Sequence, residues 1–335
     1  MTTPASAPVR GLVSVVVPTF NSGAWIDETL DSVRAQSYRP IEVIVVDNGS
    51  TDDTLERVSR DPRVRVVRVA ERGAGATRSA GIDAARGEFL QFLDSDDLLE
   101  PDKIERQLRL LDETGADVAW GPFWVYARPE PGAAFRKTRR VEPPIGDDVL
   151  ESLLRLDGFL QLGATLIRRT PALRPIRFDN GESTPCEDQR FLFEVALAGA
   201  RFARGSGDSG LLFRQHEQYR WSAVPAERFW SANRANALFV ERAWRARGEL
   251  TGRRIALLTD VYIAAARAFF TTNLAKFRET VAHLAELNPG YVALLPRRMR
   301  VLARVIGYPN AERVAAQYRR VKARLAGAAG ARGPR

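Results

Sequence analysis

The sequence predicts an α/β fold that is built on a mainly parallel β-sheet. Short runs rich in β-branched residues recur at 12–17, 41–46 and 64–69, and an apolar run follows at 89–93; segments with helical spacing separate them. Buried parallel strands are near-continuous apolar runs of this kind, rather than alternating ones. Short connections between such elements favour right-handed crossovers onto one sheet. The 335 residues leave room for about two structural units at roughly 150 residues each.

The connections between the strands carry turn and capping residues. The strand at 41–46 ends in a polar turn, in which Ser50 or Thr51 is expected to cap the next helix. A glycine-rich turn at 73–75 precedes the following helix, and the strand at 89–93 runs into an acidic turn.

The second half of the chain changes in character. Residues 128–150 are rich in Pro, Gly and Arg and are predicted to form a loop, whereas residues 150–225 mix short helices and strands. From residue 226 onward the apolar spacing is helical. We therefore expect a flexible N-terminus at 1–10, an α/β domain over 11–225, a basic helical region over 226–325 and a flexible tail at 326–335.

The charge is unevenly distributed along the chain. The net charge is +9, but residues 226–335 hold 21 Arg and Lys against 7 Asp and Glu, whereas the residues before them are net acidic. A basic region is typical of proteins that bind nucleic acid, anionic lipid or a phosphorylated ligand. Only four of the 50 basic residues are lysine, so a general bias toward arginine explains the excess equally well.

The composition also indicates a compartment. The single cysteine, Cys186, cannot form an internal disulfide, so a reducing cytoplasm is expected. No apolar run approaches the ~18 residues that a membrane-spanning helix needs. Residues 1–10 lack the apolar core of a secretory signal.

Polar residues follow three of the predicted strands, at Pro18–Asn21, Asp47–Ser50 and Asp94–Asp97. The carboxyl ends of parallel strands meet at one edge of a sheet, where ligands of such sheets bind. The three carboxylates of Asp94–Asp97 repel one another unless a cation or a shifted pKa intervenes, and Mg²⁺ or Mn²⁺ prefers such oxygen ligands. The other interpretation is an Asp-rich turn that caps the helix starting near Pro101.

Several motifs, taken in order, resemble those of the inverting family 2 glycosyltransferases, which have the GT-A fold. The resemblance covers about residues 12–222. It rests on Ser14–Asn21, Val45–Asp52, Arg78 with Gly81, Gly87–Phe89, Asp94–Asp97, Cys186–Gln189 and Phe213–His216. The implied fold is a Rossmann-like, mainly parallel sheet flanked by helices, with a helical C-terminal extension.

The resemblance implies a donor site and a metal site. The implied donor-binding residues are Pro18, Thr19, Asn21, Asp47, Asn48, Arg78, Asp94, Ser95 and Asp96. Asp96, Asp94 and His216 are the implied ligands of Mn²⁺ or Mg²⁺, although a structural role for His216 is equally open. Asn48 stands where the commonest pattern has a second Asp, and an amide both donates and accepts hydrogen bonds, so uracil, guanine and thymine donors all remain open.

Asp188 is the implied general base. It follows Glu187 in the matched motif and precedes a predicted helix that contains Phe191, Leu192, Val195 and Leu197. An attacking hydroxyl must lose its proton, and a carboxylate within hydrogen-bond reach can take it. The alternative is a pair of acidic residues that the helix dipole favours.

Four further residues have two interpretations each. Asp97 matches the family motif or caps the next helix, and Arg214 neutralises phosphate charge or is structural. Trp120 stacks on a sugar or belongs to the core. His283 has no evident acidic partner in the sequence and is expected to be structural.

These features predict a metal-dependent, inverting glycosyltransferase that moves a sugar from a nucleoside diphosphate-sugar to a hydroxyl acceptor. Polysaccharide, glycolipid or other glycoconjugate synthesis is expected, in the cytoplasm or peripherally at the inner face of the membrane. The basic helices are expected to contact anionic lipid, and no nucleic-acid motif is evident. The alternative is an inactive scaffold that binds nucleotide-sugar, membrane or RNA.

Overall fold

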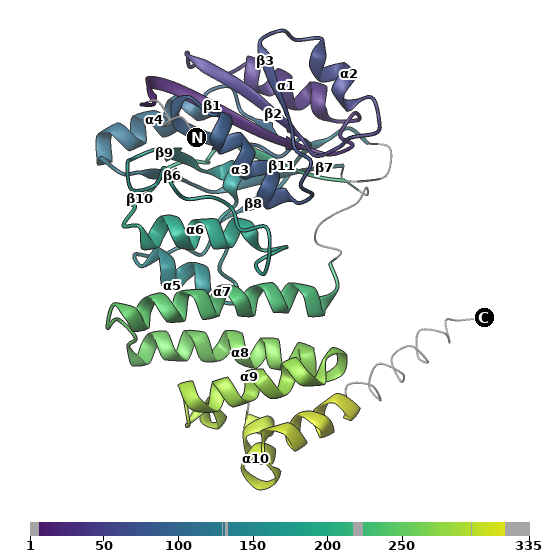
Figure 1. Cartoon of the computed structure of the whole chain (residues 1–335), viewed down its shortest axis with the longest axis vertical. Helices are drawn as coiled ribbons and strands as arrows, with labels where there is room; N and C mark the ends of the chain where they lie inside the picture. The colour runs from purple at the N-terminus through teal and green to yellow at the C-terminus, as the bar shows by residue number, and fades with distance from the viewer. Residues whose placement is uncertain (1–6, 129, 131–132, 217–223, 296, 319–335) are drawn as a thin grey trace, which may run out of the picture. The chain divides into compact units, whose positions relative to one another are not determined.

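The computed structural model describes residues 7–128, 130, 133–216, 224–295 and 297–318 (Figure 1). The chain divides into two compact units. Met1–Leu153 and Asp157–Ala223 form the first, which we call the sheet unit. Leu154–Leu156 and Val224–Arg335 form the second, which we call the helical unit.

The larger sheet of the sheet unit contains the four strands that the sequence predicts. Its order is β10-β6-β9-β4-β1-β2-β3. β1, β2, β3 and β4 pair in parallel, and β9 runs antiparallel to its neighbours β4 and β6. The strands are β1 Val9–Thr19, β2 Ile41–Asp47, β3 Val64–Arg68, β4 Gly87–Phe92, β6 Val118–Trp120, β9 Leu166–Arg168 and β10 Phe202–Arg204.

A second sheet has the order β5-β11-β7-β8, with β5 Leu98–Leu99, β11 Leu211–Gln215, β7 Phe123–Ala127 and β8 Arg136–Val141. The prediction of a loop throughout 128–150 was therefore wrong. β8 is an edge strand that pairs antiparallel with β7, and five of its six residues are exposed. Charged side chains are well tolerated on an edge strand. The basic sequence of β8 therefore lacks the apolar pattern by which a strand is normally predicted.

The helices of the sheet unit follow the predicted spacing. They are α1 Ile26–Arg34, α2 Thr54–Ser59, α3 Ala74–Ala84, α4 Lys103–Thr114, α5 Val149–Leu154 and α6 Glu187–Leu197, with a 3₁₀ turn at Leu162–Ala164. The predicted cap at Ser50 or Thr51 was wrong, because α2 begins at Thr54. Asp52 Oδ1 accepts the Thr54 N–H at 3.0 Å instead.

Apolar residues on both faces of β1 hold the helices against the sheet. Val13, Val15 and Val17 share a fully buried core with Ile26 and other α1 residues, and each such side chain contributes about 1.5–3 kcal/mol by burial. A Cβ at Gly81 of α3 would lie 2.2 Å from Val16 Cγ1. Glycine is therefore required at this position for α3 to approach β1 so closely.

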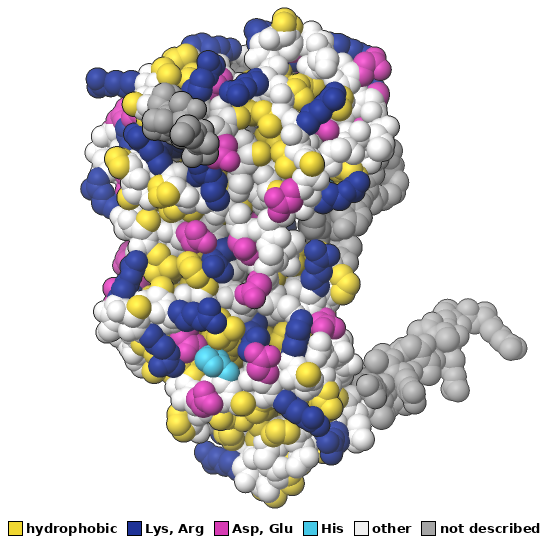
Figure 2. Space-filling view, viewed as in Figure 1, with side chains coloured by type: hydrophobic (Ala, Val, Ile, Leu, Met, Phe, Trp, Pro, Cys, Tyr) yellow, Lys and Arg dark blue, Asp and Glu magenta, His cyan; other side chains and the backbone are white. Residues whose placement is uncertain are grey.

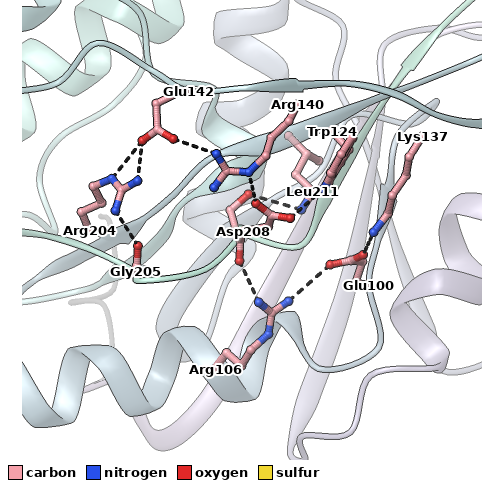
Figure 3. A network of polar contacts seen from close by, with 11 residues as sticks. Glu100, Arg106, Trp124, Lys137, Arg140, Glu142, Arg204, Gly205, Asp208 and Leu211 are labelled. Carbon is pink, nitrogen blue, oxygen red and sulfur yellow. Dashed lines mark hydrogen bonds and ion pairs between the residues drawn. The ribbon is translucent and has the colours of Figure 1, made fainter.

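A polar network joins α4 to the second sheet (Figure 3). The Asp208 carboxylate accepts hydrogen bonds from Trp124 Nε1 at 2.6 Å and Arg140 Nε at 2.5 Å. The Asp208 carbonyl accepts one from Arg106 of α4 at 2.7 Å. Strands β7 and β8 are thus held to α4 through one aspartate.

The helical unit contains α7 Ala226–Ala246, α8 Gly252–Thr272, α9 Leu274–Leu287 and α10 Arg297–Ile306, with a 3₁₀ turn at Tyr291–Leu294. α8 packs against both α7 and α9 (Figure 1). By length and composition α8 could cross a membrane, which the sequence expectation did not foresee; 44% of its most apolar window is buried in the structure. A single helix of this kind is weak evidence for a membrane span, because core helices of helical bundles share this length and composition.

A buried carboxylate links three helices of the helical unit. Glu241 of α7 accepts a hydrogen bond from Tyr262 of α8 at 2.7 Å and one from Arg245 at 2.8 Å, and His283 Nε2 of α9 lies 2.8 Å from its Oε2. Burial opposes its charge, but these donors outweigh burial and lower the pKa of Glu241 to about 2. The expectation that His283 has no acidic partner was therefore wrong.

The basic excess does not form one continuous patch on the face that Figure 2 shows. Lys and Arg side chains lie there among Asp and Glu side chains.

Candidate active site

The polar turns after β1, β2 and β4 meet at one edge of the larger sheet, as predicted. Thr19 pairs with Asp47 in the register of β1 and β2, and the Asn48 N–H donates to the Thr19 carbonyl at 3.0 Å. β4 lies on the other side of β1, and it places the Asp94–Asp97 turn at the same edge. The strand polarity thus brings the three clusters together.

The side chains of the first two turns mostly hold the turns themselves. Asp47 is buried, and its carboxylate accepts the N–H groups of Gly49 and Ser50. The Asn48 amide donates to the Glu71 carbonyl at 2.7 Å and accepts from the Gly73 N–H at 3.0 Å. Both ends of the Asn48 amide, an implied donor-binding group, therefore hydrogen-bond to backbone groups.

Asn21 and Thr19 complete this wall. Asn21 Oδ1 accepts the Thr51 N–H at 2.8 Å, so it ties the β1 turn to the β2 turn. Thr19 is buried, and its hydroxyl has no hydrogen-bond partner in the described part of the chain. Pro18 is half-buried beside it, whereas Phe20 is 50% exposed.

Arg78 of α3 connects the acidic turn to the start of α6. Its guanidinium donates to Asp94 Oδ1 at 2.9 Å and to Glu187 Oε1 at 3.0 Å. Its side chain is only 12% exposed. Burial disfavours the cation, but the surrounding carboxylates of Asp94, Glu187 and Asp188 outweigh burial and raise the pKa of Arg78. The guanidinium is therefore a permanent positive charge between two acidic motifs that are far apart in sequence.

Glu187 and Asp188 occupy the first turn of α6. Burial raises the pKa of both carboxyl groups, and Arg78 partly opposes that rise. Asp188 Oδ1 accepts the Gln189 N–H at 2.7 Å. The predicted helix after them is confirmed, with Phe191, Leu192 and Val195 buried. A carboxylate with a raised pKa is a stronger proton acceptor than an exposed one.

Asp96 and His216 form the second pair at this edge. Asp96 Oδ2 lies 2.9 Å from His216 Nε2, and Trp25 stacks on the imidazole with ring centroids 4.8 Å apart. The Ser95 hydroxyl lies 2.7 Å from that of Ser22. His216, from the end of β11, thus reaches the acidic turn 120 residues earlier.

Asp97 and Arg214 lie beneath the turn rather than at its surface. Asp97 Oδ1 accepts the Arg214 N–H at 2.7 Å, so it does not cap the next helix. The pKa of Asp97 is raised well above its usual value by burial, with Asp96 and Asp94 adding to the effect.

The Arg214 guanidinium is fully buried. It lies 4.7 Å from the Trp25 ring, 5.1 Å from the Phe135 ring and 5.9 Å from the Tyr126 ring, and it pairs with Glu28 at 2.7 Å. Arg214 is thus enclosed by an aromatic cage. Sequence patterns carry no signal for this cage, because Trp25 directly precedes α1, Tyr126 lies in β7 and Phe135 directly precedes β8.

Trp120 is 4% exposed and belongs to the core, so the stacking interpretation was wrong. Cys186, next to Glu187, is also buried. Neither residue offers an accessible group to a ligand.

The donor set at the acidic turn fits a hard divalent cation. Asp94 and Asp96 side chains are 36% and 37% exposed, so solvent and substrate can reach them, and His216 adds a nitrogen. Within residues 7–128, 130, 133–216, 224–295 and 297–318, no group of three or more His, Cys, Asp or Glu side chains is arranged to hold a metal. Mg²⁺ and related ions often take only one or two carboxylates together with substrate phosphates, which this arrangement permits.

Comparison with known proteins supports the predicted resemblance. Residues 14–175 match the family described as Glycosyl transferase family 2. The chain is 41% identical over 104 residues to an uncharacterized glycosyltransferase of Rickettsia felis, a match that covers 30% of this chain and 17% of that protein. It is 38% identical over 120 residues to the glycosyltransferase GlyG of Streptococcus pneumoniae, a match that covers 34% of this chain and 40% of GlyG. The chain therefore spans less than half the length of these curated relatives.

Solved structures share the architecture over nearly the whole chain. S. aureus TarS in complex with UDP-GlcNAc has a TM-score of 0.64 and 23% identity, and the match covers 91% of each chain. The mannosyltransferase PcManGT from Pyrobaculum calidifontis, in complex with GDP-Man and Mn²⁺, has a TM-score of 0.52 and 20% identity, and the match covers 94% of this chain and 90% of that one. The predicted GT-A fold with a helical C-terminal part is confirmed.

Proposed function

We propose, for a chain whose residues 14–175 match the glycosyl transferase family 2, that the protein transfers a glycosyl group from a nucleoside diphosphate-sugar to a hydroxyl acceptor with inversion. One observation carries the proposal. Arg78 joins Asp94 of the acidic turn to Glu187, the neighbour of Asp188, at the carboxyl edge of the sheet. The buried Arg78 cation thereby holds Asp94, on the donor side, and Glu187, which is next to the proposed general base.

Asp188 acts as the general base in this proposal. The acceptor oxygen forms a bond to the anomeric carbon as the bond from that carbon to the diphosphate oxygen breaks. The acceptor proton passes to the Asp188 carboxylate, and the nucleoside diphosphate leaves from the opposite face. The burial that raises the pKa of Asp188 favours this proton transfer.

Asp96 and His216, with Asp94 beside them, are the residues that would hold Mn²⁺ or Mg²⁺. When bound, the ion supplies Lewis-acid stabilisation of the charge on the diphosphate leaving group. The cage around Arg214 and the stacked Trp25 keep His216 directed toward Asp96.

The nucleotide would lie along the turns that contain Pro18, Thr19, Asn21, Asp47, Asn48 and Ser95. Since backbone groups engage the Asn48 amide, that side chain positions the 71–73 loop beside the base rather than reading the base directly. Uracil, guanine and thymine donors therefore all remain candidates. Two proteins of similar fold were solved in complex with UDP-GlcNAc and with GDP-Man.

We place this activity in envelope polysaccharide synthesis, in the cytoplasm or at the inner face of the membrane. Relatives are named for succinoglycan biosynthesis in Rhizobium meliloti and, as a putative assignment, for teichuronic acid biosynthesis in Bacillus subtilis. The acceptor in this proposal is a hydroxyl of a growing glycan or a lipid-linked sugar.

α10 supports contact with an anionic membrane surface. Val301 and Val305 are 60% and 78% exposed, and helical spacing places Arg297, Arg298 and Arg304 on either side of them. An apolar stripe with flanking arginines is typical of helices that lie on anionic lipid. The headgroups would attract the arginines, and the valines would enter the acyl boundary.

Donor hydrolysis tests the proposal. UDP-, GDP- and dTDP-sugars are incubated with the full chain, with and without Mn²⁺, and the released nucleoside diphosphate is measured. We expect metal-dependent release from one of these classes. Donor binding in calorimetry without any release or transfer would favour the inactive scaffold instead.

A further inference from the structure

A cavity opens on one face of the second sheet, away from the caged arginine. Its volume is about 620 Å³. Its apolar floor comes from alternate residues of three strands, Phe123 and Val125 of β7, Val141 of β8 and Phe213 of β11. Arg214, the neighbour of Phe213, points to the opposite face of the same sheet, into its cage. The cavity is therefore distinct from the site around Asp96.

Aromatic rings give the cavity an accessible stacking surface. Phe159 and Phe213 both meet Phe123 edge to face, with ring centroids 6.3 and 6.1 Å from it. Phe123 is 5% exposed, whereas Phe159 is 39% exposed. A large exposed ring at the rim of a polar-edged cavity suits the apolar face of a pyranose ring.

The charged side chains that line the cavity differ in whether they already have ion-pair partners. Arg140 and Glu142 bind each other at 3.0 Å, and they also pair with Asp208 and Arg204 respectively (Figure 3). Asp157 also has an interaction partner. The side chain of Arg139, an exposed residue of β8 paired with Val125 of β7, has no hydrogen-bond or ion-pair partner within the described residues. One guanidinium at the cavity is thus available to an anion.

Two walls of the cavity connect to the candidate active site. Gln215 lines the cavity and directly precedes His216. Asp157, another lining residue, follows four positions after Leu153, whose carbonyl accepts a hydrogen bond from the Gln189 side chain at 2.8 Å. Gln189 is the neighbour of Asp188, so the lining is linked through Gln215 to the candidate metal-site histidine and through the 153–157 segment to the start of α6.

We propose that this cavity is an acceptor subsite for a glycan that bears an anionic group, either a phosphate or a carboxylate. A sugar ring of the acceptor stacks on Phe159, and the anion binds the Arg139 guanidinium, whose planar fork matches both groups. Gln161 and Gln215 offer hydrogen bonds to hydroxyls. The inference rests on the proposed glycosyltransferase function, because it identifies the class of acceptor for that reaction.

Binding of defined oligosaccharides to the full chain tests this subsite. The probes are hexameric oligogalacturonate, a glycerol phosphate oligomer and neutral maltohexaose, each titrated by calorimetry in the presence of Mn²⁺ and, in separate experiments, UDP, GDP or dTDP. We expect one anionic probe to bind and maltohexaose to bind about tenfold more weakly, the worth of one charged hydrogen-bonded contact. The probe that binds distinguishes a phosphate-bearing from a carboxylate-bearing acceptor.

Two variants and a matched control locate the binding. Arg139→Gln should weaken the anionic probe about tenfold, and Phe159→Ala should weaken all probes. Arg136→Gln removes the same charge from the same strand but lies outside the cavity lining, so it should leave probe affinity unchanged. Near-ultraviolet circular dichroism establishes that each variant is folded.

The inference is overturned if no probe binds, if maltohexaose binds as tightly as both anionic probes, or if Arg136→Gln weakens binding as much as Arg139→Gln. Donor hydrolysis by the wild-type chain tests the proposed function separately, because hydrolysis to water needs no acceptor. Hydrolysis without anionic glycan binding would refute the subsite alone. Absence of both would refute the proposed function as well.

Discussion

Replacement of Arg78 by methionine should destabilise the sheet unit strongly. The substitution keeps a long side chain but removes the cation 3.0 Å from Glu187, and these two side chains are only 12% and 6% exposed. Breaking a buried ion pair by removing one partner costs about 3–5 kcal/mol. The second contact of Arg78, to the 36% exposed Asp94, adds at most ~1 kcal/mol because solvent screens it.

We therefore expect the free energy of unfolding to fall by about 3 kcal/mol at neutral pH. This value is at the low end of the range because Glu187 can take up a proton once Arg78 is gone. For a unit of this size that loss lowers the melting temperature by about 6–12 °C. Thermal denaturation followed by tryptophan fluorescence measures it.

The control for Arg78→Met is Arg60→Met. Arg60 lies 2.8 Å from Glu56, but the two side chains are 62% and 72% exposed. Exposed pairs of this kind contribute about 0–1 kcal/mol. If Arg78→Met lowers the melting temperature no more than Arg60→Met does, Arg78 is not the buried electrostatic link that we describe.

Four further outcomes are expected. Asp96→Ala should abolish metal-dependent binding of nucleoside diphosphate in calorimetry, and unchanged affinity would contradict the metal assignment. Asp188→Asn should cut transfer by ~10²–10⁴-fold with donor affinity nearly intact, whereas turnover within about threefold of wild type would place the base elsewhere. The pKa of Glu241 is depressed from 4.5 to about 2 in the folded state, so its stabilisation is present above pH 4.5 and is lost as the pH falls toward 2. Acid denaturation should show that loss, about 3 kcal/mol, in wild type but not in Glu241→Gln. Reversing the charges of Arg297 and Arg298 should reduce flotation with phosphatidylglycerol vesicles at low salt, and no flotation of wild type at low salt would exclude the membrane contact.

Local sequence patterns predicted the strands of the larger sheet well. The runs at 12–17 and 41–46 lie within β1 and β2, and those at 64–69 and 89–93 extend one residue beyond β3 and β4. Continuous hydrophobicity marks the buried strands β1 and β4 best. β8 was missed for the opposite reason. Its stability comes from pairing with β7 at an edge, so its side chains carry no apolar signal.

The candidate site was predictable in outline but not in its pairings. Strand polarity alone brings the turns at Thr19, Asp47 and Asp94 to one edge. The contact between Arg78 and Glu187 joins residues 109 positions apart, and the contact of Asp96 with His216 joins residues 120 apart. Only the packing of α3, α6 and β11 against the sheet determines those pairs.

The aromatic cage around Arg214 has an evolutionary consequence. The same guanidinium contacts Trp25 and Phe135, and Trp25 also stacks on His216. A substitution of Trp25 or Phe135 removes support from the buried Arg214 charge or from the His216 imidazole, so we expect single changes to be selected against more strongly than joint changes. In homologous sequences the residues at these four positions should accordingly vary together, and lineages that lose the tryptophan should also have lost the arginine.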